Sequence, residues 1–273
     1  MNSDTLKQDI RKYALSFATR RSLPVDDTHA SALIFCNLDD SFHPESLNNI
    51  RRTPDWNART RKAHQNVTGV LEMQSSNSSD ALLMNIFCHP SIQQWAGVRK
   101  VLGNDMATIA FGVHGAVQIN KGQTDTPEID MVLPGIFCEA KLTEADFTHK
   151  RPEIVESYNG LQETFHSEAL PRVGTDYDNY QIIRNLLAAK QHDRDHILLC
   201  DERRPDLVRR YMTTVSCLRD IEGRKRCRVI FWQELVEACG GALRKWIKEK
   251  YGICQQSPAP YSSPAAGSES GEA

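Results

Sequence analysis

Two carboxylates and a lysine stand in a short segment whose residue pattern predicts a β-hairpin. The segment spans residues 127–142, and each half alternates apolar and polar residues with the period of a strand. Pro134-Gly135 separates the halves and is a turn signal. Asp130 precedes this turn, and Glu139 and Lys141 follow it. Acidic and basic side chains on paired strands are the groups that a metal-assisted hydrolytic site requires.

A loop of two or four residues centred on Pro134-Gly135 fixes the register of the two strands. One face then carries only apolar pairs: Leu133–Ile136, Met131–Cys138 and Ile129–Ala140. The other face carries the remaining pairs: Val132–Phe137, Asp130–Glu139 and Glu128–Lys141. A loop of odd length would break this register, and L-Pro-Gly does not favour the tightest hairpins, so the pairing is conditional on loop length.

The pairing of Asp130 with Glu139 needs an explanation, because like charges directly opposite each other destabilise a sheet at the usual Cβ separation of about 4.5–5.5 Å. A divalent cation between the two carboxylates would supply it. Lys141 follows Glu139 by two residues, so it projects from the same face of the strand. The alternative is an exposed sheet face on which Glu128 and Lys141 form an ion pair and the other acids are solvated.

The arrangement of an Asp, a short hairpin and Glu-x-Lys resembles the PD-(D/E)XK nucleases, the restriction-endonuclease-like superfamily. It stands here as Asp130, eight residues, and Glu139-Ala140-Lys141, with Ile129 in place of a proline directly before the Asp. Two further segments resemble one bacterial branch of that superfamily. They are Ser-Ser-Asp-Ala-Leu-Leu-Met-Asn-Ile-Phe at residues 78–87 and Tyr-Gln-Ile-Ile-Arg-Asn at residues 180–185.

The resemblance implies Mg²⁺-dependent hydrolysis of phosphodiester bonds, with Mn²⁺ as a substitute cation. Mg²⁺ prefers oxygen ligands, and the family pattern offers Asp130, Glu139 and the backbone carbonyl of Ala140. Lys141 would orient or deprotonate the attacking water, or stabilise the charge on the phosphate. Three residues are candidates for auxiliary roles: Glu72, Glu128 and Gln181.

Each auxiliary candidate also has an ordinary structural interpretation. Glu72 is also compatible with a surface acid before the first core helix, and Glu128 with a cross-strand ion pair. Gln181 is compatible with an exposed helix face. Thr143-Glu144 follow the lysine directly and predict a cap for a helix after the hairpin.

The chain predicts the α/β fold class, with helix, three strands, helix, strand, helix and strand in order. These elements are expected at residues 81–87, 108–120, 127–142, 180–190, 196–200, 206–218 and 227–232. The order is similar to the restriction-endonuclease-like αβββαβ core, a central mixed sheet flanked by helices. Residues 1–69 are expected to form an N-terminal helical extension, residues 70–254 the nuclease-like domain, and residues 255–273 a disordered tail.

Composition places the chain among ordinary globular proteins, with 40% hydrophobic and 25% charged residues among 273. We find no apolar run long enough for a membrane span and no signal-peptide pattern, so we expect a soluble cytoplasmic protein without a membrane partner. Eight cysteines stand singly, several of them in apolar runs, and we expect buried free thiols. Examples are Cys36, Cys88, Cys138 and Cys200.

The formal net charge of −2 gives no basic footprint for nucleic-acid binding. Local basic clusters exist around residues 51–62, 203–210 and 224–228, each also compatible with a solvated surface. The resemblance nevertheless implies a nucleic acid as the partner, with DNA as the expected substrate. Two alternatives remain: a catalytically silent nucleic-acid-binding or scaffold protein on the same fold, and an unrelated α/β protein.

Overall fold

The computed structural model describes residues 1–65 and 67–254, so the expected tail at residues 255–273 lies outside it. The α-helices are α1 (Ser3–Arg20), α2 (Pro44–Arg52), α3 (Pro54–Arg59), α4 (Ser79–Phe87), α5 (Ala96–Leu102), α6 (Pro152–Val155), α7 (Leu161–Thr164), α8 (Tyr180–Gln191), α9 (Pro205–Ser216), α10 (Ile221–Lys225), α11 (Trp232–Ala238) and α12 (Gly241–Tyr251). The strands are β1 (Val25–Asp26), β2 (Ile34–Phe35), β3 (Ala110–His114), β4 (Val117–Ile119), β5 (Gln123–Asp125), β6 (Glu128–Leu133), β7 (Ile136–Ala140), β8 (His149–Lys150), β9 (Arg172–Val173), β10 (Asp176–Asp178), β11 (Asp195–Cys200) and β12 (Cys227–Phe231).

The central sheet has five strands in the order β12-β11-β7-β6-β3. Strand β6 runs antiparallel to its neighbours β3 and β7, whereas β7, β11 and β12 run parallel to one another. The parallel pairs require crossovers, and α8 and α9 supply them. This confirms the predicted mixed α/β fold with a restriction-endonuclease-like core order.

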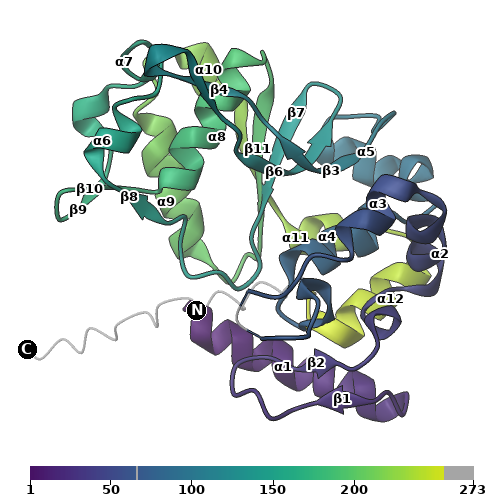
Figure 1. Cartoon of the computed structure of the whole chain (residues 1–273). Helices are drawn as coiled ribbons and strands as arrows, with labels where there is room; N and C mark the ends of the chain where they lie inside the picture. Colours follow the sequence, from purple (N-terminus) through teal and green to yellow (C-terminus); the bar gives the residue numbers. More distant parts are fainter. Residues whose placement is uncertain (66, 255–273) are drawn as a thin grey trace, which may run out of the picture.

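Helices cover both faces of the sheet (Figure 1). Helices α1, α4, α5, α11 and α12 pack on one face, and α8 and α9 on the other. Strand β11 contributes to both cores, with Ile197 and Leu199 on one side and Leu198 and Cys200 on the other. Strands buried on both faces read as continuous apolar runs, as residues 196–200 do.

The hairpin between β6 and β7 has the predicted register over three pairs. Met131 lies opposite Cys138, and Leu133 opposite Ile136. The loop is the two-residue Pro134-Gly135, and Gly135 adopts a φ of 73° that a side chain would disfavour. The ladder ends at Met131, so three expected pairs are not part of it: Asp130 with Glu139, Ile129 with Ala140 and Glu128 with Lys141.

The N-terminal segment packs against the same core as the sheet. Leu6, Ile10 and Phe17 of α1 share one hydrophobic cluster with Met131 of β6 and Trp246 of α12. Helices α2 and α3 are separated by Thr53, because the residue before a proline is disfavoured in a helix. The division of the chain at residue 69 stays a prediction, and the two sides of that boundary bury their apolar residues together.

Two other sequence-based expectations are wrong. No helix begins at Thr143-Glu144 in the described chain, where an irregular segment runs from residue 141 to β8. Cys36 is exposed, whereas Cys88, Cys138 and Cys200 are buried free thiols as expected. No helix among the described residues meets the length and hydropathy needed to cross a membrane.

A buried histidine in β11 predicts a loss of stability in acid. His196 is 1% exposed, and burial lowers its pKa from 6.5 to about 4. The unfolded chain therefore binds a proton more readily, so the stabilisation is complete above pH 6.5 and is lost as the pH falls towards 4. Integration gives a loss of about 3 kcal/mol in the free energy of unfolding.

Denaturant unfolding of the wild type and of His196→Leu at pH 6.5 and pH 4 measures this effect. The variant should lose less stability than the wild type over that range. Equal losses in the two proteins would show that another group is responsible.

Candidate active site

A cavity of about 310 Å³ collects every residue that the sequence pattern assigned to the site. It lies where β6 and β7 meet α4 and α8. Its lining includes all seven predicted residues: Glu72, Glu128, Asp130, Glu139, Ala140, Lys141 and Gln181. Six carboxylates and three cationic side chains line it, so its charge balance is acidic.

The side chain of Asp130 extends the contact between the two hairpin strands beyond the end of their backbone ladder. Its Oδ2 atom accepts a hydrogen bond from the backbone N–H of Ala140 at 2.8 Å. The side chain of Asp130 therefore binds the partner strand just beyond the last backbone pair. Burial, and after it the nearby Glu139 and Asp80, raise the pKa of Asp130 well above its ordinary value.

Glu139 and Lys141 form a buried ion pair of 2.9 Å between Oε1 and Nζ. Helix α8 supplies a partner to each: Asn185 Nδ2 donates to Glu139 Oε2 at 2.7 Å, and Lys141 Nζ donates to Gln181 Oε1 at 3.1 Å. Burial alone would lower the pKa of Lys141, but Glu139, Glu144 and Asp130 raise it above its ordinary value. Lys141 is therefore a cation at neutral pH.

The second face of the hairpin is not a solvated surface. Glu139 and Lys141 are 3% and 6% exposed because α8 lies over them. The expected ion pair between Glu128 and Lys141 is wrong, since β7 ends at Ala140 and Glu128 turns towards other cations. Gln181, one of the auxiliary candidates, contacts Lys141, and its role in the site stays a prediction.

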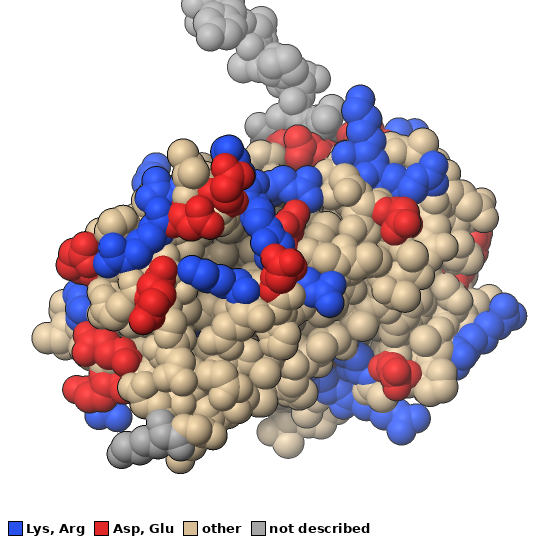
Figure 2. Space-filling view, turned by 90° about the horizontal axis from the view of Figure 1, so that it is seen from above, with Lys and Arg blue, Asp and Glu red and all other residues tan. Residues whose placement is uncertain are grey.

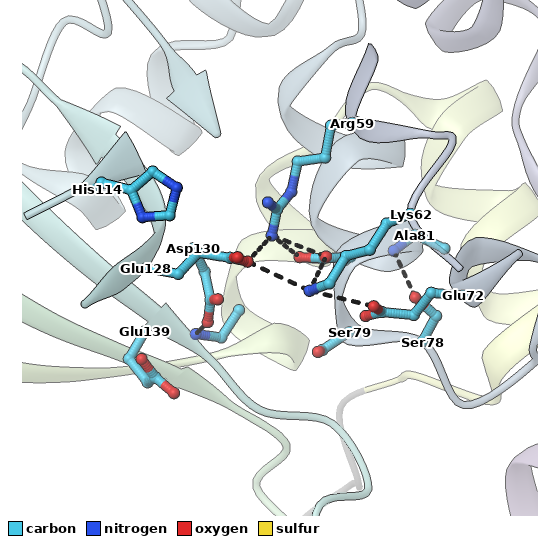
Figure 3. A network of polar contacts seen from close by, with 12 residues as sticks. Arg59, Lys62, Glu72, Ser78, Ser79, Ala81, His114, Glu128, Asp130 and Glu139 are labelled. Carbon is cyan, nitrogen blue, oxygen red and sulfur yellow. Dashed lines mark hydrogen bonds and ion pairs between the residues drawn. The ribbon is translucent and has the colours of Figure 1, made fainter. Parts of the chain in front are cut away.

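Arg59 and Lys62 connect three carboxylates beside Asp130 (Figure 3). Arg59 Nη2 contacts Asp80 at 2.8 Å and Glu128 at 2.9 Å. Lys62 Nζ lies 3.1 Å from Glu72, 3.2 Å from Glu128 and 3.8 Å from Asp80. Glu72, which the sequence left between a site residue and a surface acid, thus belongs to this network through Lys62.

Asp80 is the acid that sequence reasoning missed. It lies in the first turn of α4, two residues after Ser78, whose side chain caps the helix by accepting from Ala81 N at 3.1 Å. Asp80 is 3% exposed and raises the pKa of Asp130. The sequence signal was available, because an acid in the first turn of an apolar helix is buried only when something pairs with it.

Glu144 fixes the segment after Lys141 instead of capping a helix. Its Oε2 accepts from Leu142 N at 2.6 Å, and its Oε1 accepts from Ser79 Oγ at 2.7 Å. Arg204, which is fully buried, donates to the carbonyl of Glu144 at 2.7 Å. These contacts bind the Lys141 segment to α4 and to the start of α9.

The residues around Asp130 and Glu139 fit a divalent cation that takes oxygen ligands. Asn185 Oδ1 lies beside Glu139, is buried and has no hydrogen-bond partner among the described residues, so it is an unused oxygen at the cavity. The described chain holds no group of three or more His, Cys, Asp or Glu side chains arranged as a metal cage. Mg²⁺ commonly takes one or two carboxylates, with waters and substrate phosphates completing its shell.

Comparison with known proteins gives one family. The family model REase-ARP, described as restriction endonuclease associating with ARP, matches residues 24–252. No curated protein and no solved structure gives a significant match. The family description suggests a nuclease-like function and an interaction with nucleic acid. With the central mixed sheet and the acidic cavity at the β6–β7 hairpin, this match shows that the chain belongs to the REase-ARP family of restriction-endonuclease-like proteins.

Proposed function

We propose that this protein is a PD-(D/E)XK-type nuclease that hydrolyses phosphodiester bonds of DNA with Mg²⁺ at the cavity between β6, β7 and α8. The observation that carries the proposal is the convergence of Asp130, Glu139 and Lys141 in one cavity. A solvated hairpin face would leave these groups apart in water. Here they are buried together at a cost in desolvation, which a catalytic site explains and an exposed face does not.

Asp130, Glu139 and the carbonyl of Ala140 are the groups that would hold the cation. When bound, Mg²⁺ would activate a water and neutralise charge on the phosphate. The bond from Ala140 N to Asp130 fixes the orientation of that carboxylate. Asn185 performs the same task for Glu139, as outer hydrogen-bond partners do in known metal sites.

Lys141 would stabilise negative charge on the phosphate and would not remove a proton from the water. Three neighbouring carboxylates keep it protonated, and Gln181 holds its Nζ at the cavity. A buried cation close to a developing negative charge acts in a low dielectric, where its effect is large. Glu72, Glu128 and Asp80 would act indirectly, through the positions of Arg59 and Lys62.

DNA as substrate, Mg²⁺ as cofactor and Mn²⁺ as its substitute follow from the family's link to restriction endonucleases and from the oxygen ligands at the site. The test is incubation of the purified protein with supercoiled plasmid and with RNA, with Mg²⁺ or Mn²⁺ against EDTA. Cation-dependent cleavage that Glu139→Ala and Lys141→Ala both abolish is the expected result. Cleavage that survives both substitutions would place the activity elsewhere.

Replacing Asn185 by leucine is expected to weaken metal-dependent cleavage by about 10- to 100-fold, the usual effect of losing a group that orients a metal ligand. Leucine fills the space but donates no hydrogen bond to Glu139. Initial cleavage rates over a range of Mn²⁺ concentrations should show a higher cation requirement. Lys190→Ala, an exposed change on the same helix, is the control and should leave that requirement unchanged.

A further inference from the structure

A nuclease with this cavity needs a cationic surface outside it. Six carboxylates against three cations would repel the phosphate backbone, and the whole chain has a net charge of −2. Most of the affinity of proteins for nucleic acid comes from Lys and Arg contacts to phosphates. On the face seen in Figure 2, cationic and acidic side chains alternate, so that face offers no region of a single sign.

The basic clusters visible in the sequence are used within the fold. Each places cations in ion pairs or buried hydrogen bonds: Arg51 with Asp39, Arg59 with Asp80, Arg203 with Asp201, Arg204 with Asp206, Arg210 with Asp178, Lys225 with Glu222, and Arg226 with Asp193. These residues hold loops and helices in place. Their charge is neutralised by these partners, whereas Arg52, Arg61 and Arg209 of the same clusters are exposed and have no ion pair among the described residues.

A different set of cations gathers in a groove between α1 and α12. The groove has a volume of about 760 Å³. Five cations line it, from both ends of the chain: Lys12, Arg20, Arg244, Lys245 and Lys248. Only two acids line it, Asp9 and Glu249. Each of the two helices packs on the core through the face that carries its buried residues, and the groove is lined by residues from the other side of each helix. The groove therefore faces outward.

The two acids do not neutralise the groove, because each binds a cation that is not part of its lining. Asp9 accepts from Arg203 at 2.8 Å, and Glu249 accepts from Arg21 at 2.7 Å. Arg244 and Lys248 form ion pairs with Glu237, which is not part of the lining. Lys12 and Lys245 are exposed and have no ion pair within residues 1–65 and 67–254, so they are the groove cations that remain open to an anion. Unpaired like charges on neighbouring helices repel each other, which is tolerable where an anion binds between them.

An aromatic ring is held within the same groove. Tyr13 is 41% exposed and lies against Gly252 at the end of α12. A Cβ atom on Gly252 would lie 2.3 Å from Cε2 of Tyr13, so only glycine permits this contact. The groove thus offers an aromatic ring among cations, a combination suited to sugar or base contacts beside phosphates.

Helix α1 runs from this groove to a cleft that adjoins the cavity of the candidate active site. Ser3 Oγ donates to the carbonyl of Thr143 at 2.6 Å, two residues after Lys141. Lys7 lines the cleft that adjoins the cavity. From Lys7 to Arg20 the helix rises about 20 Å, which corresponds to roughly six base pairs of a duplex. A duplex leaving the cleft can therefore extend to the groove.

We propose that the α1–α12 groove binds the phosphate backbone of the DNA whose scissile bond lies in the cavity. The proposal rests on the proposed nuclease function, and it assigns the affinity for DNA to a surface away from the catalytic carboxylates. Charge complementarity selects this occupant, because the groove carries an excess of cations and the cleft does not.

The test is binding of a 30-base-pair duplex in EDTA by the full chain and by the double variant Lys12→Glu, Lys245→Glu. We expect at least a tenfold loss of affinity in the variant. The slope of log affinity against log salt should fall by about 2, one for each lost phosphate contact. Circular dichroism melts check that the variant is folded.

The matched control is Lys100→Glu, Lys190→Glu, which changes the net charge equally at exposed lysines outside the groove. An equal loss of affinity in this control, or none in the groove variant, would overturn the proposal. Poly-L-glutamate is the second probe. If the wild type binds it more tightly than the duplex and only that binding is lost in the groove variant, the groove is a protein-docking surface and the proposal fails.

Binding in EDTA separates this proposal from the nuclease function. Groove-dependent binding without cleavage under any cation supports the groove and contradicts the nuclease. Cleavage with duplex affinity unaffected by the groove variant contradicts the groove alone.

Discussion

Replacing Asp130 by asparagine is expected to lower DNA cleavage at least about 10³-fold, a change of roughly 4 kcal/mol in the barrier. Asparagine has the same shape and retains an oxygen to accept from Ala140 N. It lacks the negative charge that would hold the cation. The loss should therefore appear in the rate with Mg²⁺ and also with Mn²⁺, measured from initial rates of plasmid nicking.

The same substitution is expected to raise the free energy of unfolding by about 1 kcal/mol or more, as changes that relieve a strained functional site do. Burial and two neighbouring acids make the charged form of Asp130 unfavourable in the folded protein. Asparagine removes that penalty. Urea unfolding at pH 7 in EDTA measures the gain without competition from a cation.

The matched control for Asp130→Asn is Glu153→Gln, which removes one charge from an exposed position. It should change neither cleavage nor stability appreciably. An Asp130→Asn protein that cleaves at the wild-type rate would contradict the assignment of the site. An Asp130→Asn protein with a lower free energy of unfolding than the wild type would contradict the inference that the charged form of Asp130 destabilises the fold.

Replacing Arg59 by methionine is expected to lower the free energy of unfolding by about 3 kcal/mol, the effect of removing one partner from a buried ion pair. Asp80, whose side chain is 5% exposed, would lose its closest cation, and Glu128 would lose one of two. Arg59 also lies over Gly112 of β3, where a Cβ atom would be 1.9 Å from Nη1. The absence of a side chain at Gly112 therefore leaves room for the guanidinium.

A double-mutant cycle makes this prediction specific to the ion pair. Adding Asp80→Asn to Arg59→Met should recover much of the lost stability, because no buried charge is then left unpaired. Arg61→Met, at an exposed position two residues later, is the control. If Arg59→Met costs no more than Arg61→Met, or if Asp80→Asn restores nothing, the network does not stabilise the fold in the way described.

Local patterns in the sequence were enough to predict the hairpin and the core order. The register of Met131 with Cys138 follows from alternation about a two-residue turn, and that information lies within 16 residues. Helix α8 was equally predictable from its apolar stripe, and the structure brings its Gln181 to Lys141 as the interpretation allowed.

The environment of the carboxylates could not be read in this way, because it depends on segments distant in the chain. The ion pair of Arg59 with Glu128 joins residues 69 positions apart, and the cover over Glu139 comes from Asn185, 46 positions later. Alternation specifies which side of a strand a residue faces. It does not specify whether a helix covers that side, so the second face was left open as a solvated surface.

The α1–α12 groove was hidden for the same reason. Its cations come from two helices at opposite ends of the chain, and nothing in the run at residues 244–248 indicates that Lys12 and Arg20 lie beside it. Many cations of the clusters noted in the sequence form ion pairs within the fold, as Arg203 with Asp201 and Arg226 with Asp193 illustrate. A local run of charge therefore does not identify a binding surface until the acids packed against it are known.

The central claim is that Asp130 and Glu139 together hold a divalent cation that supports hydrolysis. Calorimetric titration of Mn²⁺ into the wild type, Asp130→Asn and Glu139→Ala, with plasmid cleavage followed in the same samples, tests it most directly. We expect Mn²⁺ binding by the wild type, loss of that binding in both variants, and cleavage only in the sample that binds the cation. Equal Mn²⁺ binding by all three proteins, or cleavage by a variant that binds none, would contradict it.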